Sequence, residues 1–294
     1  MTIDQETPQH VVRFYGTVDY AIDVLKNRQV AFVHVSKLND PFDPYYFFET
    51  DFGDSYQNLI AHVIHNHPND RPWFRAHVTA QSWGQTVKEL KVQLQKARES
   101  AFVLCTSAAD SDRHPKDNLY MWGHYANGHR GLAIEFDTQA LVSAVLKHHE
   151  TETGKPLEET NVWTKIEYTK TFSPITAEMV YEFIKQEMEL SKGKRAVRTA
   201  TQLDTHYKRM TTIKSDVWQS ENEWRLLWRN ADTQEKFYKC PIGEDAIASI
   251  FLGLSLAPEK AQQLIAAARQ NFPAASILRA HKRHGDLALE FRPE

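Results

Sequence analysis

The sequence is poor in glycine and cysteine, and each shortage excludes a class of site. None of its 11 glycines falls in a G-x-G-x-x-G fingerprint or a phosphate-binding P-loop. The 2 cysteines, Cys105 and Cys240, lie far apart in apolar surroundings, so we expect buried thiols in a reducing compartment rather than a disulfide framework. An H-E-x-x-H pattern and a cysteine pair suited to zinc are also missing, and no metal site is predicted.

Long apolar runs and a strong excess of one charge are absent as well. No apolar run is long enough to span a bilayer, and the polar residues 1–10 lack the apolar centre of a signal peptide. We therefore expect a cytoplasmic protein without a membrane partner. The net charge of −3 argues against a dedicated, strongly basic nucleic-acid binder, although it is compatible with a local basic patch.

The expected strands and helices do not alternate regularly along the chain. Apolar alternation predicts a first strand at residues 11–15, and a helix then runs to about residue 28. Helices are also expected at 54–67 and at 82–100, where the second opens with a capping box at Ser82. A strand is expected at 162–168. This mixture favours an α+β fold over a doubly wound parallel sheet.

We expect a single α+β domain over residues 1–294, with a helical insert at about 173–212. The insert is rich in basic residues, which could contact phosphates. The alternative is a solvated helix face balanced by Glu187 and Glu189. The basic residues are Lys192, Lys194, Arg195, Arg198, Lys208 and Arg209.

An acidic and indole-rich stretch at residues 218–225 carries the most informative spacing. Glu221 and Glu223 lie two residues apart, between Trp218 and Trp224. In an extended strand, residues i and i+2 point to the same face, so the two carboxylates would share one side. Converging carboxylates suit chemistry at a sugar carbon, where positive charge must be stabilised and a hydroxyl held. The alternative is a strand start with solvated acids and core tryptophans.

Three histidines near a predicted helix end, His62, His65 and His67, could ligate a metal, although surface histidines explain the same pattern. His124 and His129 flank a turn, where they would either touch a ligand or pack the loop.

A second carboxylate pair lies beside prolines. Asp40 and Asp43 could hold a divalent ion together with Glu221 and Glu223, as a nuclease would require. Asx residues next to prolines are also ordinary turn formers, which is the structural alternative.

Arg13, on the first expected strand, has the planar, permanently charged fork that grips a phosphate or carboxylate. Together with Thr106 and Ser107 at the end of a middle strand and Glu223 at a late one, it forms an ordered arginine, hydroxyl and glutamate triplet.

Four blocks, in this order, resemble those of a widespread bacterial domain family of unknown function. They are L-N-D-P-F-D at 38–43, L-C-T-S at 104–107, M-W-G-H-Y-A at 121–126 with the strand at 131–136, and E-N-E-W-R at 221–225.

The triplet is also similar to the arginine-serine-glutamate class of the ADP-ribosyltransferase superfamily. This resemblance implies split mixed or antiparallel β-sheets with surrounding helices, and NAD as co-substrate. It implies that Arg13 holds the pyrophosphate, that Thr106 or Ser107 supports the nicotinamide ribose, and that Glu223 binds the ribose 2′-hydroxyl. Glu221 would orient the incoming nucleophile. The middle motif here is Cys-Thr-Ser rather than Ser-Thr-Ser.

The resemblance further implies an aromatic that stacks on nicotinamide, for which Tyr15, Phe42 and Tyr125 are the candidates. The pocket walls and the contacts to the target would come from the loop and helix blocks. The residues concerned are Asn39, Asp40, Asp43, Trp122, His124 and His129.

The function expected from this resemblance is an NAD-dependent ADP-ribosyltransferase that modifies RNA, DNA or protein. It would act as a bacterial toxin or anti-phage effector, with a neutralising antitoxin as a further partner. Two alternatives stay open: a non-enzymatic recognition or regulatory module, and a metal-dependent nuclease that uses the clustered carboxylates.

Overall fold

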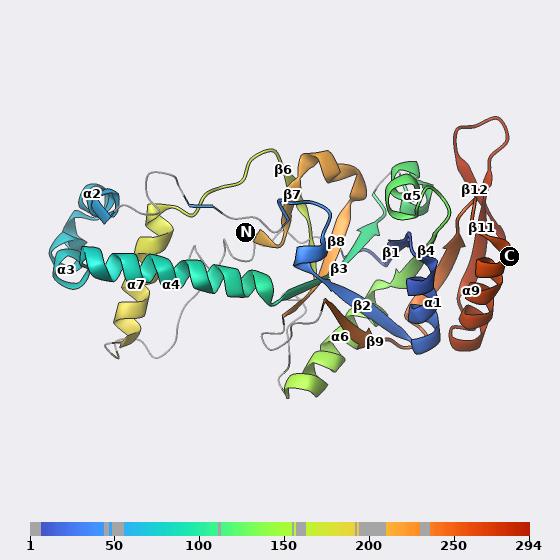
Figure 1. Ribbon diagram of the computed structural model, residues 1–294, viewed down its shortest axis with the longest axis horizontal. Helices are drawn as coiled ribbons and strands as arrows, with labels where there is room; N and C mark the ends of the chain where they lie inside the picture. Colours follow the sequence, from blue (N-terminus) through green and yellow to red (C-terminus); the bar gives the residue numbers. More distant parts are fainter. Residues whose placement is uncertain are drawn as a thin grey trace. The chain divides into compact units, whose positions relative to one another are not determined.

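The computed structural model divides the chain into two compact units (Figure 1). Unit 1 consists of Met1–Lys37, Ala101–Ile166 and Val217–Glu294, and unit 2 of Leu38–Ser100 and Glu167–Asp216. The structure describes residues 7–43, 47–48, 56–110, 113–154, 156, 163–191, 193, 210–229 and 236–294. The basic residues of the expected insert lie outside these ranges. Unit 2 also draws on residues 38–100, whereas the sequence predicts one domain with an insert at about 173–212.

The described part of unit 1 is built on a ten-stranded sheet, in which all pairings are antiparallel except that of β10 with β11. The order β12-β11-β10-β4-β1-β3-β2-β9 is completed by β8, which pairs with β3 and β5. The strands are β1 (His10–Tyr15), β2 (Gln29–His34), β3 (Ala101–Ala108), β4 (Leu132–Asp137), β5 (Trp163–Lys165), β8 (Glu223–Arg229), β9 (Phe237–Pro241), β10 (Ile247–Leu252), β11 (Ser276–Lys282) and β12 (Leu289–Pro293). An α+β fold with a mostly antiparallel sheet is thus confirmed.

The sheet divides at β3. One edge of this strand pairs with β8 along its length, and Ser107 lies opposite Glu223. The other edge pairs with β2 near its start, where Phe102 faces His34, and with β1 near its end, where Ser107 faces Val12. The two strands on this edge therefore separate from each other along β3.

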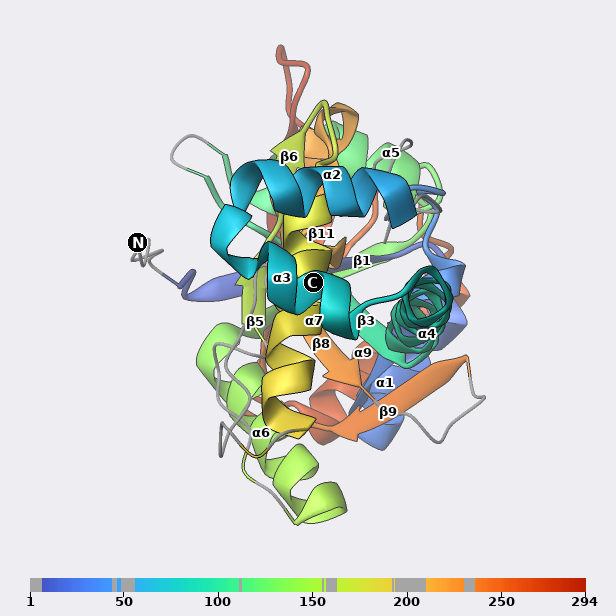
Figure 2. The same ribbon diagram turned by 90° about the vertical axis from the view of Figure 1, so that its left-hand side faces the viewer.

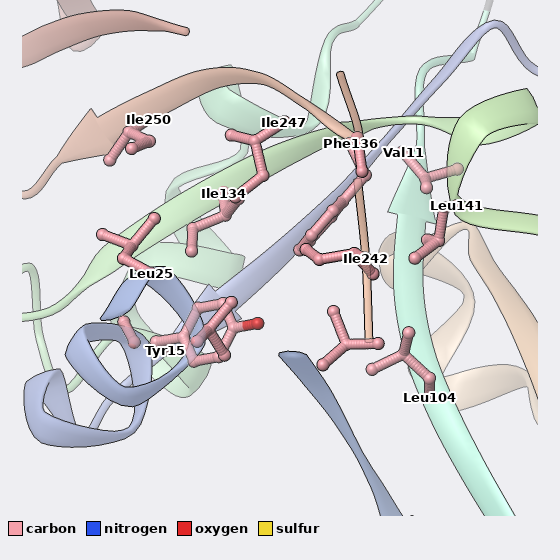
Figure 3. Packing of buried hydrophobic residues seen from close by; sticks show 14 of the residues in the cluster. Val11, Tyr15, Leu25, Leu104, Ile134, Phe136, Leu141, Ile242, Ile247 and Ile250 are labelled. Carbon is pink, nitrogen blue, oxygen red and sulfur yellow. The ribbon is translucent and has the colours of Figure 1, made fainter. Parts of the chain in front are cut away.

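Alternation along β1 separates two faces of the sheet. Val11 and Tyr15 pack in the main core with Ile134 and Phe136 of β4, as Figure 3 shows, whereas Val12 packs in a smaller core on the opposite face. The helices α1 (Val18–Asn27), α6 (Thr138–Thr153) and α9 (Pro258–Asn271) bury their apolar sides in the main core. We call this side the α1 face.

The opposite side, here the α5 face, is covered by α5 (Leu119–Tyr125). Its buried Trp122 packs with Val12, Ala133 and Phe251 in the smaller core. A T-shaped contact joins the Trp122 and Phe14 rings, whose centroids lie 5.3 Å apart. Trp122 Nε1 also donates to the Lys116 carbonyl at 2.7 Å, which satisfies the one polar atom of this buried side chain.

Unit 2 has a helical core of its own. It contains α2 (Tyr56–Asn66), α3 (Arg71–His77), α4 (Ala80–Glu99), α7 (Ala177–Ser191) and a parallel pair of short strands, β6 (Glu167–Thr169) and β7 (Ile213–Ser215). The helices α2 and α7, which cross in Figure 2, bury Leu59, Val63, Val180 and Ile184 in one cluster with Phe74 of α3. A strand predicted at 162–168 is therefore wrong as one element, because β5 pairs in unit 1 and β6 in unit 2.

None of the helices that the structure describes combines the length and the apolar character needed to cross a bilayer. Both cysteines are thiols rather than disulfide partners. Cys240 is buried, which raises the pKa of its thiol to about 12, and Cys105 is partly exposed rather than buried as expected.

The capping box of α4 begins three residues earlier than the sequence predicts. Thr79 is the N-cap, its hydroxyl accepts a hydrogen bond from Ser82 N at 3.1 Å, and Ser82 Oγ accepts one from Thr79 N at 2.8 Å. We expect Thr79→Ala to lower the free energy of unfolding by about 1 kcal/mol, because it leaves a helix-terminal N–H without its acceptor. Urea unfolding followed by circular dichroism measures the loss. Thr86→Ala, inside the same helix, is the control and should not destabilise.

Candidate functional site

Two of the expected catalytic side chains meet on the α5 face. Ser107 of β3 and Glu223 of β8 are directly paired across the strands, and Ser107 is also paired with Val12, which belongs to the core under α5. Paired residues of neighbouring strands point to the same side of a sheet. Both side chains are buried. The structure thus brings the alcohol and the acid together.

The acid has a basic neighbour that sequence reasoning missed. Arg225 Nε lies 2.6 Å from Glu223 Oε1, and Nη2 lies 3.1 Å from Oε2, so the guanidinium binds the carboxylate through two hydrogen bonds. The side chains are 1% and 3% exposed. Residues i and i+2 of a strand point to the same face, so Glu223 and Arg225 share one. This spacing can be read from the sequence and could have predicted the pair. The ion pair fixes the orientation of the Glu223 carboxylate.

Glu221 lies in a 3₁₀ helix before β8 rather than in the extended strand that the sequence predicts. It is the last residue of a short 3₁₀ helix, η5 (Asp216–Glu221), and Asn222 then adopts a left-handed conformation with φ of 42°. An extended strand through both acids, as the sequence predicts, is therefore wrong. The Asn222 side chain donates to the Ala108 carbonyl at 3.0 Å, and the Asn222 carbonyl accepts from Ala108 N at 3.1 Å. These bonds tie the turn to the end of β3.

A wall of the site is formed by α5. The Tyr125 hydroxyl donates to Glu221 Oε1 at 2.5 Å, and Asn118, the N-cap of α5, donates through Nδ2 to the Ser220 carbonyl at 2.7 Å. The helix is thus bonded to the 3₁₀ turn at both of its ends. Of the residues expected to stack on or contact a ligand, Tyr125 is placed beside the expected catalytic acids.

Aromatic rings continue this wall outward. The exposed His124 ring stacks on Tyr120 at a centroid distance of 5.4 Å and lies 5.4 Å from the ring of Trp218. It also contacts Tyr125 edge-on at 4.8 Å. Flat rings of this kind offer a surface on which a planar base can stack.

The strand register places Arg13, Tyr15 and Thr106 on the α1 face, away from Glu223. Arg13 alternates with Val12, and its guanidinium carbon lies over the Tyr15 ring, 5.5 Å from the centroid. Burial raises the pKa of Tyr15, which the charge of Arg13 partly offsets. Thr106 donates its hydroxyl hydrogen to the Trp224 carbonyl at 2.9 Å. Arg13 and Glu223 therefore lie on opposite faces of the sheet, which corrects the expectation that both bind one NAD molecule. Of Thr106 and Ser107, it is Ser107 whose side chain lies on the same face as Glu223.

Two other expected contact residues serve packing. Trp122 is fully buried, and His129 stacks on it with the ring planes 6° apart and the centroids 5.9 Å apart. Burial lowers the pKa of His129. His129 also closes the turn after α5, because its N–H donates to the Trp122 carbonyl. The alternative that this histidine packs the loop therefore explains its position.

The remaining expected contact residues belong to unit 2. Asn39, Asp40, Phe42 and Asp43 precede α2, and Asp40 Oδ1 accepts a hydrogen bond from Phe42 N at 2.9 Å. The Asp43 N–H donates to the Asp40 carbonyl at 3.1 Å. Such an Asx turn is the structural alternative for these residues.

A further buried acid lies on the α5 face. Glu135 of β4 is paired with Val12, and its Oε1 lies 2.7 Å from His114 Nε2. Burial by itself would raise the pKa of Glu135, but hydrogen bonds with His114 and Ser249 outweigh it and lower the pKa. The sequence carries no spacing that links residues 114 and 135, because the contact depends on the sheet register.

Comparison with known families locates one match on this chain. A domain of unknown function, DUF2971, is found at residues 121–226. The DUF2971 match includes most of α5, all of β4 and β5, and the stretch with Glu221, Glu223 and Arg225, whereas Ser107 and residues 38–43 precede it. No curated protein and no solved structure matches the chain.

Proposed function

We propose that the α5 face of unit 1 catalyses ADP-ribosyl transfer from NAD, with Glu223 as the central acid. The observation that carries the proposal is the pairing of Ser107 with Glu223, whose carboxylate is fixed by Arg225. An oriented carboxylate beside an alcohol suits a ribose, because it can accept a hydrogen bond from the 2′-hydroxyl and stabilise the positive charge that develops at the anomeric carbon.

Departure of nicotinamide needs little catalytic assistance from the protein. In NAD the nicotinamide is already cationic, so no strong general acid is needed when its glycosidic bond breaks. Glu223 would stabilise the cation formed at the ribose, and Ser107 would donate a hydrogen bond to support that acid. Preorganised charge of this kind is commonly worth 10²–10³ in rate.

Glu221 and the aromatic wall extend the proposal to the other reactants. The Tyr125 hydroxyl holds the Glu221 carboxylate, which would orient the nucleophile of the acceptor. The rings of Tyr125, His124 and Trp218 offer surfaces for a base. The acceptor class is a macromolecule: RNA, DNA or protein. Arg13 has no part in this proposal, because it lies on the α1 face.

Nicotinamide release from labelled NAD tests the proposal. We expect the wild-type chain to release nicotinamide equally with and without EDTA, and Glu223→Gln to reduce the rate by about 10²–10³. Ser107→Ala should also reduce it, whereas Glu259→Gln, a matched change of an exposed acid on α9, should not. Circular dichroism shows that each variant is folded. Absence of NAD binding and turnover in the wild type would sink the enzymatic proposal.

The buried Glu223–Arg225 pair favours a second candidate, a non-enzymatic recognition module in which this pair is structural. Glu223→Gln would then change only stability. The metal-dependent nuclease receives no such support: within the described part of unit 1, Glu221 and Glu223 belong to no group of three metal-ligating side chains. The EDTA arm, repeated with RNA and DNA as substrates, still tests it.

A further inference from the structure

Two of the three histidines that the sequence offers as metal ligands converge with a glutamate within unit 2. His62 Nε2 lies 2.7 Å from Glu178 Oε2, and His67 Nε2 lies 2.8 Å from the same oxygen. His67 Nε2 is also 2.9 Å from Glu178 Oε1. Among the described residues, this is the group of three or more His, Cys, Asp and Glu side chains whose ligand atoms lie within 4.8 Å of one another.

The local fold explains why these residues meet. His62 lies on α2, which ends at Asn66, and His67 is the N-cap of the short helix that begins at Pro68. The chain turns at this point, so His67 lies back beside His62, with ring centroids 6.2 Å apart. Glu178 comes from the first turn of α7, where a carboxylate is favoured by the helix dipole.

We propose that His62, His67 and Glu178 bind a divalent transition-metal ion of the zinc class. Two imidazole nitrogens and one carboxylate oxygen form a donor set that zinc uses with three protein ligands, and the fourth position is left for water or an external ligand. His62 and His67 would both bind through Nε2.

The separations fit the ion after small side-chain rotations. Zinc–nitrogen and zinc–oxygen bonds are about 2.0–2.2 Å, so ligand atoms in a tetrahedron lie about 3.3–3.5 Å apart. The present nitrogen–oxygen distances of 2.7–2.9 Å need to widen by roughly half an ångström. The three side chains are 24%, 28% and 30% exposed, so an ion can enter from solvent.

Neighbouring side chains hold both imidazole rings in place. Asn66 Nδ2 lies 3.0 Å from His62 Nδ1, and the Tyr181 ring stacks on His67 at 4.3 Å. Tyr181 is itself fixed by a hydrogen bond to Asp70. When His62 Nε2 binds a metal, Nδ1 carries the proton, and the Asn66 amide turns its oxygen toward it. Partners of this kind orient metal-binding histidines.

The competing explanation is an ion pair without a metal. Burial by itself would raise the pKa of Glu178, but hydrogen bonds from His67 and His62 outweigh it and lower the pKa. Such a pair is strongest when both imidazoles carry a second proton. A metal site behaves in the opposite way, because protons compete with the ion for the imidazole nitrogens.

Metal titration of the full-length chain separates the two explanations. We expect one equivalent of Zn²⁺ to bind at pH 7.5, and Co²⁺ to give a visible ligand-field spectrum that Zn²⁺ abolishes. Glu178→Gln and His67→Ala should weaken binding at least about 100-fold, and Asn66→Ala about 10-fold. His65→Ala, on the exposed side of α2, is the matched control and should bind as the wild type does.

Thermal unfolding shows whether each variant is folded and whether Zn²⁺ stabilises it. Zn²⁺ at a hundred times its Kd should raise the Tm of the wild type by roughly 5 °C or more, and EDTA should reverse the shift. A folded Glu178→Gln chain should show no such shift. Binding that is equal in the His65→Ala, His67→Ala and Glu178→Gln chains, or weaker than micromolar in the wild type, would overturn the proposal. Affinity that rises between pH 7.5 and pH 5.5 would do so as well.

Discussion

Replacing Arg225 with alanine should lower the free energy of unfolding by about 3–5 kcal/mol, because the change leaves the Glu223 carboxylate buried without its guanidinium. Both side chains are almost fully buried, so the charge of Glu223 is balanced within the protein by Arg225. Chemical denaturation followed by tryptophan fluorescence measures the loss.

A matched pair on the surface provides the control. Arg279 and Glu294 also form two hydrogen bonds, at 2.8 Å and 2.7 Å, but their side chains are 21% and 27% exposed. Arg279→Ala should therefore cost no more than about 1 kcal/mol. The double variant Glu223→Leu with Arg225→Met should recover most of the stability lost in Arg225→Ala, because it removes both charges of the pair together. Equal losses at Arg225 and Arg279 would contradict the role of burial.

Gly131→Ala should destabilise unit 1 by about 3 kcal/mol or more, because an added methyl group has no room there. A Cβ atom at this position would lie 2.0 Å from the Tyr15 carbonyl oxygen, and 3.1 Å from that of Ala126. Both contacts are with backbone, which can yield only if α5 and β4 separate from β1. Lower Tm and altered near-ultraviolet circular dichroism of the buried Trp122 would report that separation.

The same substitution at Gly84 should have the opposite effect on stability. A Cβ atom on this glycine of α4 meets nothing within 4 Å, so Gly84→Ala should stabilise the helix by about 1 kcal/mol. The two substitutions add the same methyl group and differ only in the space around it. A stable Gly131→Ala chain would show that the close approach of the turn to β1 is not needed.

Elements set by local periodicity could be predicted from the sequence. The helix after the first strand buries Ala21, Ile22, Val24 and Leu25, which are the residues that its spacing predicts. The strand at 11–15 was equally clear. The sequence did not reveal which way this strand faces, because Val11 and Val12 are both apolar and both faces of the sheet are covered. Arg13 was therefore assigned to the site without a basis for choosing its face.

The prediction of the candidate site is wrong in part, because a turn interrupts the strand that the spacing of the two acids predicts. Glu221 and Glu223 follow the i, i+2 spacing, but the 3₁₀ helix and the left-handed Asn222 break the extended backbone between them. The sequence names His62, His65 and His67 as possible metal ligands, but it does not indicate which two of them meet. His62 and His67 are five residues apart, which is unfavourable on one continuous helix, and the turn before Pro68 brings them together. Glu178 is far away in sequence.

Unit 2 consists of two segments that interrupt the sequence of unit 1 at two places. The segment with α2, α3 and α4 leaves unit 1 near His34 of β2 and returns at Phe102 of β3, to which His34 is paired. The second segment leaves after Lys165 of β5 and returns before Trp224 of β8, to which Lys165 is paired. Each excursion thus replaces the tip of a β-hairpin. Doubling the length of such a loop costs only about 0.6 kcal/mol in closure entropy. Insertions and deletions in unit 2 can accordingly be absorbed at two hairpin tips while every strand register of unit 1 is kept.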